Sequence, residues 1–251
     1  MTNIDLTGKH AVVTGGSSGI GTAVVRTLAA AGASVTVLAR SRAYSDAEAT
    51  MYDDPKVDFR PLDVSDSAAV TEVFAAVAAE KGIDIAVLSA GVLMPGTILD
   101  TDDETWRKVM AVNLDGLFYT TREAIRAMMA QGRGGKVVSI GSISGYRANQ
   151  GFNAYCTAKG GALNFTRQVA MDYAAHGINV NAVAPGFITT PMTEIYDSEV
   201  KATLAGQTPD GQWGTPQQIA DAALFLCSDL SAHMHGQSLL VDGGWTLGVF
   251  A

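Results

Sequence analysis

The chain has 251 residues, of which 47% are hydrophobic and 17% are charged, a composition that can bury the core of one α/β domain. Its formal net charge of −8 argues against nucleic acid as a partner, and no apolar run is long enough to cross a membrane. Cys156 and Cys227 are far apart in sequence and the histidines form no ligand pattern, so we expect free thiols, no metal site and a cytoplasmic location.

The N-terminal part has the pattern of a nucleotide-binding unit. A strand expected over 10–14 is followed directly by the turn Gly15-Gly-Ser-Ser-Gly19-Ile-Gly21 and by a helix over 22–31. Glycines let the backbone approach a pyrophosphate, and the N-terminus of a helix carries partial positive charge. We therefore predict that this turn binds the phosphates of a dinucleotide.

The end of the second expected strand, 34–39, indicates which dinucleotide is bound. An acidic residue at this position would bind the ribose 2′-hydroxyl of NAD, but the chain has Ala39, followed by Arg40, Ser41 and Arg42. A guanidinium can bind a 2′-phosphate through charge-assisted hydrogen bonds. This pattern favours NADP(H), with NAD(H) as a second cofactor, unless the two arginines are only solvated loop charges.

The rest of the chain continues the alternation of strands and helices. Further strands are expected over 56–62, 83–88, 135–142, 178–184 and 237–241. Helices are expected over 66–81, from about 100 to 131, from the region of Tyr155 to about 175, and from 216 to 227. Asp63 or Ser65 is a candidate cap for the helix over 66–81. The alternation predicts one Rossmann-type, doubly wound α/β domain over 1–251, with a parallel seven-stranded sheet and helices on both faces.

Several expected strands end in small or polar residues, which would meet at one edge of the sheet. Asp63 and Ser142 follow two of these strands, and Ser89-Ala-Gly91 follows another. Ligands bind at this edge in doubly wound folds. The segment 187–214 is rich in loop residues and apolar side chains, and we expect it to form a lid over a substrate.

Tyr155 and Lys159 are the candidate acid–base pair. They are four residues apart and therefore share one face of a helix. A lysine cation there favours the phenolate and can lower a tyrosine pKa that is normally about 10. Asn113 lies within an expected helix, where asparagine is mildly unfavourable, so it is expected to be there for its amide or for a bend.

These motifs together resemble those of the classical short-chain dehydrogenase/reductase family. The matching elements cover nearly the whole chain in the family's order, and they are Thr14-Gly15-x-x-x-Gly19-Ile20-Gly21, Asp63-Val64, Ala90-Gly91, Asn113, Ser142, Tyr155-x-x-x-Lys159, Pro185-Gly186 with Thr190, and Asp242-Gly-Gly. The resemblance implies a nicotinamide-dependent oxidoreductase that acts on CH–OH groups and that is usually a homotetramer. The net charge and the lack of a long apolar run separately predict no nucleic acid or membrane partner.

The resemblance also implies roles for individual residues. Tyr155 would be the general acid, and Ser142 would hydrogen-bond the substrate carbonyl. Lys159 would bind the nicotinamide ribose and lower the tyrosine pKa, and Asn113 would hold a helix bend and a water of the proton relay. The expected cofactor residues are Gly15, Ser17, Ser18, Gly19, Ile20, Gly21, Arg40, Ser41, Asp63, Val64, Ser89, Ala90, Gly91, Tyr155, Lys159, Pro185, Gly186, Ile188 and Thr190. The expected substrate-pocket residues are Ser144, Gln150, Phe187, Met192 and Tyr196.

Two positions depart from the family pattern: Ser89 stands where an asparagine is usual, and Ser18 stands where many NADP-preferring members have a basic residue.

The leading interpretation is an NADP(H)-dependent enzyme that interconverts a secondary alcohol with a ketone, a keto ester or a sugar-type carbonyl. An alternative is reduction of 3-oxoacyl thioesters on acyl carrier protein, an acidic partner that would need a basic patch. Candidate residues for that patch are Arg122, Arg126, Arg133 and Arg147. A more distant alternative is a nicotinamide-binding sensor without catalysis.

Overall fold

A seven-stranded, all-parallel sheet forms the centre of the computed structural model, which describes residues 4–248. Its strand order is β3-β2-β1-β4-β5-β6-β7. The strands are β1 His10–Thr14, β2 Ser34–Ala39, β3 Val57–Pro61, β4 Ile85–Leu88, β5 Gly135–Ile140, β6 Ile178–Pro185 and β7 Ser238–Val241. The chain winds outward from β1 to β3, then returns to pair β4 with β1. This confirms the predicted doubly wound sheet and places its switch point between β1 and β4.

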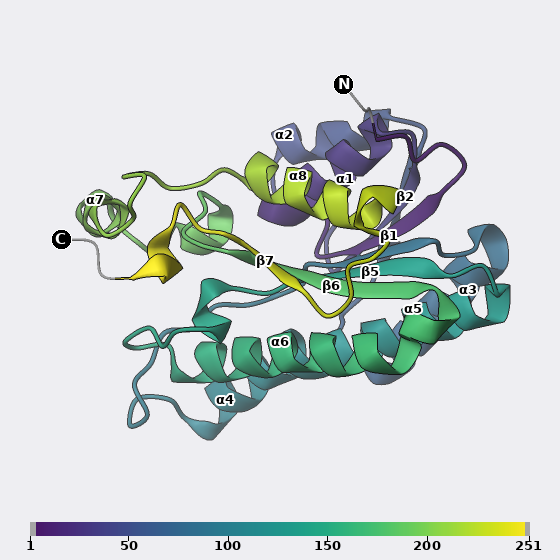
Figure 1. Cartoon of the computed structure of the whole chain (residues 1–251). Helices are drawn as coiled ribbons and strands as arrows, with labels where there is room; N and C mark the ends of the chain where they lie inside the picture. The colour runs from purple at the N-terminus through teal and green to yellow at the C-terminus, as the bar shows by residue number, and fades with distance from the viewer. Residues whose placement is uncertain (1–3, 249–251) are drawn as a thin grey trace.

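Helices cover both faces of this sheet (Figure 1). One face carries α1 Gly19–Ala30 and α8 Pro216–Cys227, with the short α2 Asp46–Ala49 beside α1. The other face carries α3 Ser67–Lys81, α4 Asp103–Met110, α5 Gly116–Gln131 and α6 Asn153–Tyr173. α7, Ser198–Gly206, lies apart from both layers, near the C-terminal end of the described chain.

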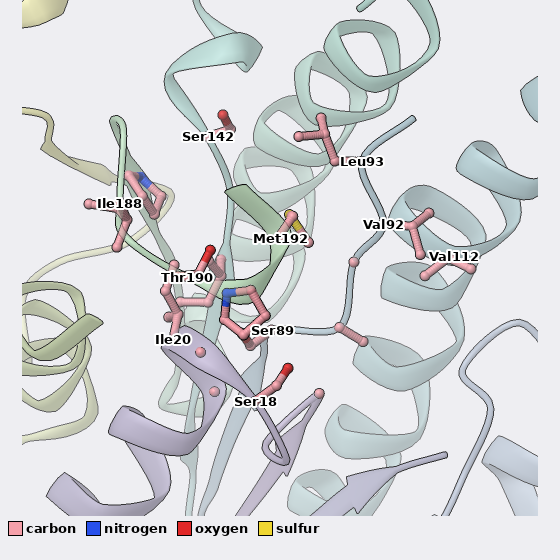
Figure 2. A pocket seen from close by; sticks show the side chains of 18 of the residues that line it. Ser18, Ile20, Ser89, Val92, Leu93, Val112, Ser142, Ile188, Thr190 and Met192 are labelled. Carbon is pink, nitrogen blue, oxygen red and sulfur yellow. The ribbon is translucent and has the colours of Figure 1, made fainter. Parts of the chain in front are cut away.

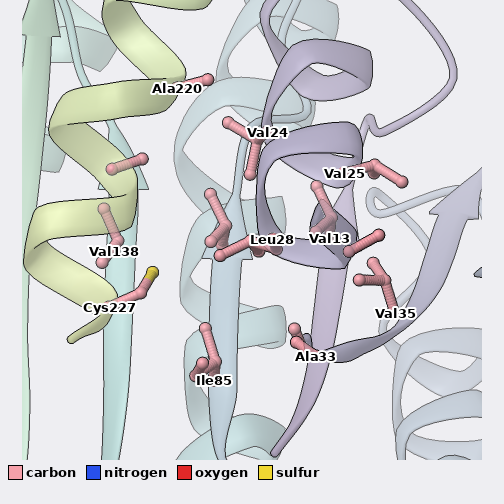
Figure 3. Close-up of a cluster of buried hydrophobic side chains, with 14 of the residues drawn as sticks. Val13, Val24, Val25, Leu28, Ala33, Val35, Ile85, Val138, Ala220 and Cys227 are labelled. Carbon is pink, nitrogen blue, oxygen red and sulfur yellow. The ribbon is translucent and has the colours of Figure 1, made fainter. Parts of the chain in front are cut away.

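The core on the α1 and α8 face is built from small aliphatic side chains (Figure 3). Val24 and Leu28 of α1 are almost completely buried, and so is Ala220 of α8. Small residues let the two helices pack closely on each other and on the sheet. Full burial of a leucine such as Leu28 contributes about 2 kcal/mol. The rigid face that results fixes the start of α1, where the glycine-rich turn lies.

Three local features differ from expectation. The helix expected from about 100 to 131 is divided by a π-helical turn, Ala111–Asp115, between α4 and α5. α3 is capped by Asp66, whose carboxylate accepts hydrogen bonds from the N–H groups of Ala68 and Ala69 (both 3.0 Å). Neither Asp63 nor Ser65 caps it, because these two side chains bond each other. The segment 187–214 contains α7 and is therefore not only loop.

The buried His10 of β1 makes the stability of the fold depend on pH. Its ring nitrogens lie 2.8 Å from the Ser34 hydroxyl and 3.3 Å from the Thr36 hydroxyl, and its side chain is buried. Burial, aided by the charge of Lys81, lowers the pKa of His10 to about 4. In the unfolded chain the imidazole has a pKa of about 6.5, so between pH 6.5 and pH 4 the unfolded state binds a proton that the folded state does not. The free energy of unfolding is therefore highest above pH 6.5 and decreases as the pH falls toward 4.

The expected consequence is a loss of about 3 kcal/mol of unfolding free energy from His10 between pH 6.5 and pH 4. Urea unfolding at several pH values measures it. His10→Gln removes the titrating group, so the variant should show a flatter dependence on pH than the wild type. Parallel pH dependences in the two proteins would show that His10 is not the responsible group.

Candidate active site

One cleft runs along the C-terminal ends of the strands, at the edge where ligands are expected (Figure 2). Most of the predicted site residues line it. These are Gly15, Ser17, Ser18, Gly19, Ile20, Gly21, Arg40, Asp63, Val64, Ser89, Ala90, Gly91, Ser142, Ser144, Tyr155, Lys159, Pro185, Gly186, Phe187, Ile188, Thr190, Met192 and Tyr196. The fold therefore brings together residues that are up to 181 positions apart (196 − 15).

The glycine-rich turn forms the floor of the cleft at the start of α1. Gly15 has a φ of +65°, and a side chain at Gly21 would place its Cβ only 2.1 Å from the carbonyl oxygen of Gly15. No residue larger than glycine fits at either position. The turn therefore presents backbone N–H groups and the positive end of α1 to the cleft without intervening side chains.

Thr14, the last residue of β1, fixes the neighbouring wall of the cleft. Its hydroxyl lies 3.2 Å from the backbone nitrogen of Ser89 and 3.3 Å from that of Ala90, and both N–H groups donate to it. The segment after β4 is thereby held against the end of β1. Ser89, although shorter than the usual asparagine, keeps the place in the cleft that the sequence predicts.

Asn113 supports this wall from behind and does not line the cleft. Its Oδ1 accepts a hydrogen bond from the N–H of Val92 (2.9 Å), and its Nδ2 donates to the carbonyl of the same residue (2.8 Å). The buried amide is therefore held on both its oxygen and its nitrogen by the backbone of one residue. Asn113 lies in the π-helical turn between α4 and α5, at the place where a helix bend was expected.

Ser142 and Tyr155 meet at the centre of the cleft. Ser142 follows β5 and accepts a hydrogen bond from the N–H of Ser144 (3.0 Å). Tyr155 lies in the first turns of α6. Burial raises the pKa of Tyr155 to about 12, and the nearby Ser142 hydroxyl opposes that shift. Tyr155 is therefore a neutral phenol at physiological pH.

Lys159 is buried one turn further along α6. Its Nζ donates to the carbonyl oxygen of Ile140 at the end of β5 (2.8 Å) and lies 5.7 Å from the centroid of the Tyr155 ring. Burial lowers the pKa of Lys159 to about 8. Desolvation is the largest influence on the pKa of the Tyr155 phenol, and the lowering of that pKa by Lys159 stays a prediction.

The segment 187–214 closes one side of the cleft as a loop with joined ends. The N–H of Gly214 donates to the carbonyl of Phe187 (2.8 Å), and the N–H of Thr189 donates to the carbonyl of Gly214 (3.0 Å). Thr190 of this segment lies beside Ile20 at the start of α1 (Figure 2). The segment therefore reaches across the cleft to the glycine-rich turn.

Aromatic rings form the outer wall of the same region. Trp213 packs against both Phe187 and Tyr196, with ring centroids 5.5 Å and 6.0 Å apart. Tyr196 also approaches Phe152, at 6.4 Å. The wall therefore joins the 187–214 segment to the start of α6.

Comparison with known proteins places this geometry in a family. Residues 15–246 match the family model described as enoyl-(acyl carrier protein) reductase. Galactitol 2-dehydrogenase (L-tagatose-forming) of Cereibacter sphaeroides is 40% identical over 246 residues, covering 96% of each chain. The 3-oxoacyl-(acyl-carrier-protein) reductase of Escherichia coli K12 is 39% identical over 238 residues, covering 94% of this chain and 97% of its own. The chain belongs to the short-chain dehydrogenase/reductase family.

A solved member of the short-chain dehydrogenase/reductase family has the same fold with a cofactor. The Agrobacterium tumefaciens protein assigned as a 2-deoxy-D-gluconate 3-dehydrogenase, solved with bound NADP, superposes with a TM-score of 0.91. It is 35% identical and covers 99% of this chain and 100% of its own. As a family member, the chain is an oxidoreductase that acts on CH–OH groups. Within residues 4–248, no helix is both long enough and apolar enough to span a membrane.

Besides Asn113, two predicted site residues lie outside the cleft, Ser41 and Gln150. Ser41 is exposed, because the chain turns away from the cleft after Arg40. The next residue, Arg42, stacks on the Tyr52 ring at 4.5 Å, and the Arg42 carbonyl accepts a hydrogen bond from the Tyr52 hydroxyl. Gln150 is also exposed and does not line the cleft.

Sequence reasoning missed several polar residues that do line the cleft, two of which are Asn149 and Tyr44. Asn149, one position before Gln150, donates from Nδ2 to the hydroxyl of Ser144 (2.7 Å). Tyr44, in the loop after β2, lines the end near Arg40. The Asn149 contact depends on the turn before α6, and neither residue belongs to a family motif, so only the folded geometry identifies them.

Charge is concentrated at one end of the cleft. Arg40 lines it beside Asp63, and a hydrogen bond from Ser65 together with the nearby Arg40 charge lowers the pKa of the Asp63 carboxyl, although partial burial opposes this shift. Arg40, Asp63 and Lys159 are the charged residues among those that line the cleft in the described part of the chain. The far end, toward Phe152 and Tyr196, is lined by uncharged side chains.

Proposed function

We propose that this protein is an NADP(H)-dependent oxidoreductase that interconverts an uncharged carbonyl compound and a secondary alcohol, with Tyr155 as acid and base. Ketones, keto esters and sugar-type carbonyls belong to this substrate class. The observation that carries the proposal is the convergence of Ser142, Tyr155 and Lys159 in a cleft that begins at a glycine-rich turn. Family membership supports the reaction class.

The residues of the cleft fit a nicotinamide dinucleotide. The turn around Gly15 and Gly21 leaves room only for bare backbone and would hold the pyrophosphate at the start of α1. Arg40 would bind the 2′-phosphate, and Lys159 would hold the nicotinamide ribose. NADP bound to the Agrobacterium relative supports this choice of cofactor. When bound, NADP(H) supplies or accepts the hydride.

The protein's own contribution to carbonyl reduction is a placed proton and a placed hydrogen bond. A tyrosine with a pKa of about 12 carries its proton at neutral pH and can donate it to the substrate oxygen. The Ser142 hydroxyl can donate a hydrogen bond to that oxygen as negative charge develops. Lys159 provides a nearby ammonium group that favours the resulting phenolate while it is protonated, below its pKa of about 8. Asn113 keeps the wall at Val92 in place.

The substrate end of the cleft favours uncharged molecules. Its polar side chains include those of Ser144, Asn149 and Tyr196, and Leu93, Phe152, Phe187 and Met192 provide apolar contacts. A substrate carboxylate bound there would lose water without gaining a cationic partner, which costs several kcal/mol. The pocket therefore suits a neutral ketone or keto ester better than a sugar acid.

A matched pair of substrates tests this preference. Methyl benzoylformate and benzoylformate differ in one ester group, so they share the ketone and the ring. The expected kcat/KM with NADPH is at least about tenfold higher for the ester, because the acid must bring an unpaired charge into the pocket. Equal or higher kcat/KM for the free acid would contradict a neutral substrate class.

Reduction of 3-oxoacyl thioesters on acyl carrier protein is the second candidate, and it is supported by the E. coli relative of that name. An acidic carrier needs free cations near the cleft. However, Arg122 and Arg126 both pair with the buried Glu123 (2.8 and 2.9 Å), and Arg133 pairs with Asp84 (2.9 Å). Of the four candidate arginines, only Arg147 forms no ion pair with an acidic side chain in the described chain, and its guanidinium carbon lies 5.7 Å from the Trp245 ring centroid. The free-ketone activity is therefore the first proposal.

Other properties follow from family membership as proposals. We expect a homotetramer in the cytoplasm, with one domain carrying both cofactor and substrate. The 187–214 segment would act as the substrate lid, since its ends are tied together at Phe187 and Gly214 while Met192 and Tyr196 face the cleft.

A further inference from the structure

Glu48 of α2 places a negative charge next to the phosphate-binding turn. Its Oε1 accepts a hydrogen bond from the N–H of Gly19, the first residue of α1 (3.2 Å). Its Oε2 accepts from the N–H of Tyr44 (3.1 Å) and from the Ser45 hydroxyl (3.3 Å). Ser18, the N-cap of α1, makes no side-chain capping bond. The carboxylate that caps α1 therefore comes from a residue 29 positions away.

The same contacts tie the loop after β2 to the turn. Gly19 and Tyr44 both line the cleft, and the half-buried Glu48 joins them from the side. On the far side of the loop, Arg26 of α1 donates to the Thr50 hydroxyl (2.9 Å). The loop that carries Arg40 is thus fixed against α1 by one anionic and one cationic side chain.

The position of Glu48 has an electrostatic consequence for the cofactor. The positive end of α1 attracts any nearby anion, whether a side-chain carboxylate or a phosphate. A carboxylate already hydrogen-bonded there reduces the local positive potential and repels a second anion. Repulsion grows with the charge of the ligand, so a 2′-phosphorylated cofactor loses more affinity than NAD. Arg40, at the same end of the cleft, has the opposite effect, because its positive charge attracts the 2′-phosphate.

We propose that Glu48 is a specificity-determining residue that restrains the preference for NADP(H) over NAD(H). This inference rests on the proposed function, because it takes both nicotinamide dinucleotides as ligands of the cleft. Arg40 supplies the attraction for the 2′-phosphate, and Glu48 limits it, so NAD(H) remains usable. Glu48 acts on the cofactor through its charge and through the loop it holds.

Equilibrium titration of NADP⁺ and NAD⁺ with Glu48→Gln tests the proposal without any turnover. Glutamine keeps an acceptor for the Gly19 N–H but removes the charge. The expected result is a Kd for NADP⁺ that falls roughly three- to tenfold, with less than about a twofold change for NAD⁺. High salt should shrink the difference between wild type and variant, because it screens the charge of Glu48.

Asp46→Asn is the matched control, since Asp46 is an exposed carboxylate in the first turn of the same short helix. It should leave the ratio of the two Kd values unchanged. An unchanged or raised Kd for NADP⁺ in Glu48→Gln, or an equal change for both cofactors at all salt concentrations, would overturn the proposal and leave Glu48 as a structural cap. Failure of every ketone to react would contradict the proposed function but not this binding result.

Discussion

Replacing Tyr155 with phenylalanine is expected to lower kcat for carbonyl reduction by about 10²- to 10⁴-fold, which is the usual contribution of a positioned general acid. The variant keeps the ring that packs at the start of α6 and loses only the hydroxyl that meets Ser142. NADPH affinity should change little, because the phosphate-binding turn and Arg40 are untouched. Steady-state kinetics and NADPH fluorescence titration together separate the two effects.

Tyr196→Phe is the control for this substitution. Tyr196 also lines the cleft, and burial also raises the pKa of its phenol, but it belongs to the aromatic wall with Trp213. Its loss should change KM for the substrate more than kcat. If Tyr155→Phe retained wild-type kcat, or if Tyr196→Phe lost as much, Tyr155 would not be the proton donor.

Replacing Arg40 with alanine is expected to raise KM for NADPH by about 10- to 100-fold, the equivalent of one or two charge-assisted hydrogen bonds to a phosphate. KM for NADH should stay within about threefold of wild type, because NADH has no 2′-phosphate to lose that contact. Arg40 is exposed and lines the cleft beside Asp63, so the substitution should not disturb the core. Parallel kinetics with both cofactors measure the difference.

Arg42→Ala provides the matched control, since Arg42 is two positions away but stacks on Tyr52. It should leave the ratio of the two KM values near that of the wild type. Equal losses with NADPH and NADH in Arg40→Ala would mean that Arg40 supports the loop and does not recognise the 2′-phosphate.

The sheet and the glycine-rich turn could be predicted because their signals are local. β1 and β2 are mostly apolar segments that end before Gly15 and Arg40, and the structure has them with the predicted bounds. A parallel strand buried on both faces is rich in apolar residues, so a small or charged residue after such a run marks its end. The order of the family motifs then places most of the cleft residues correctly.

The features that the sequence does not reveal depend mostly on contacts between segments that are distant in sequence. α7 buries no side chain, so no apolar periodicity marks Ser198–Gly206 as helical. The bond between Glu48 and Gly19 depends on how the loop after β2 folds back on α1, which local sequence does not specify. The pKa of Tyr155 also follows from burial in the assembled cleft, whereas spacing alone suggested only the influence of Lys159.

The most direct test of the proposed activity is a product assay with the purified protein, NADPH and two substrates. One is a neutral keto ester, and the other is a 3-oxoacyl thioester on acyl carrier protein. The expected result is one molecule of secondary alcohol formed from the keto ester for each NADPH consumed, without any carrier protein. Turnover of the carrier-bound thioester alone, or binding of NADPH with no alcohol formed from the keto ester, would contradict a reductase of free, uncharged carbonyl compounds.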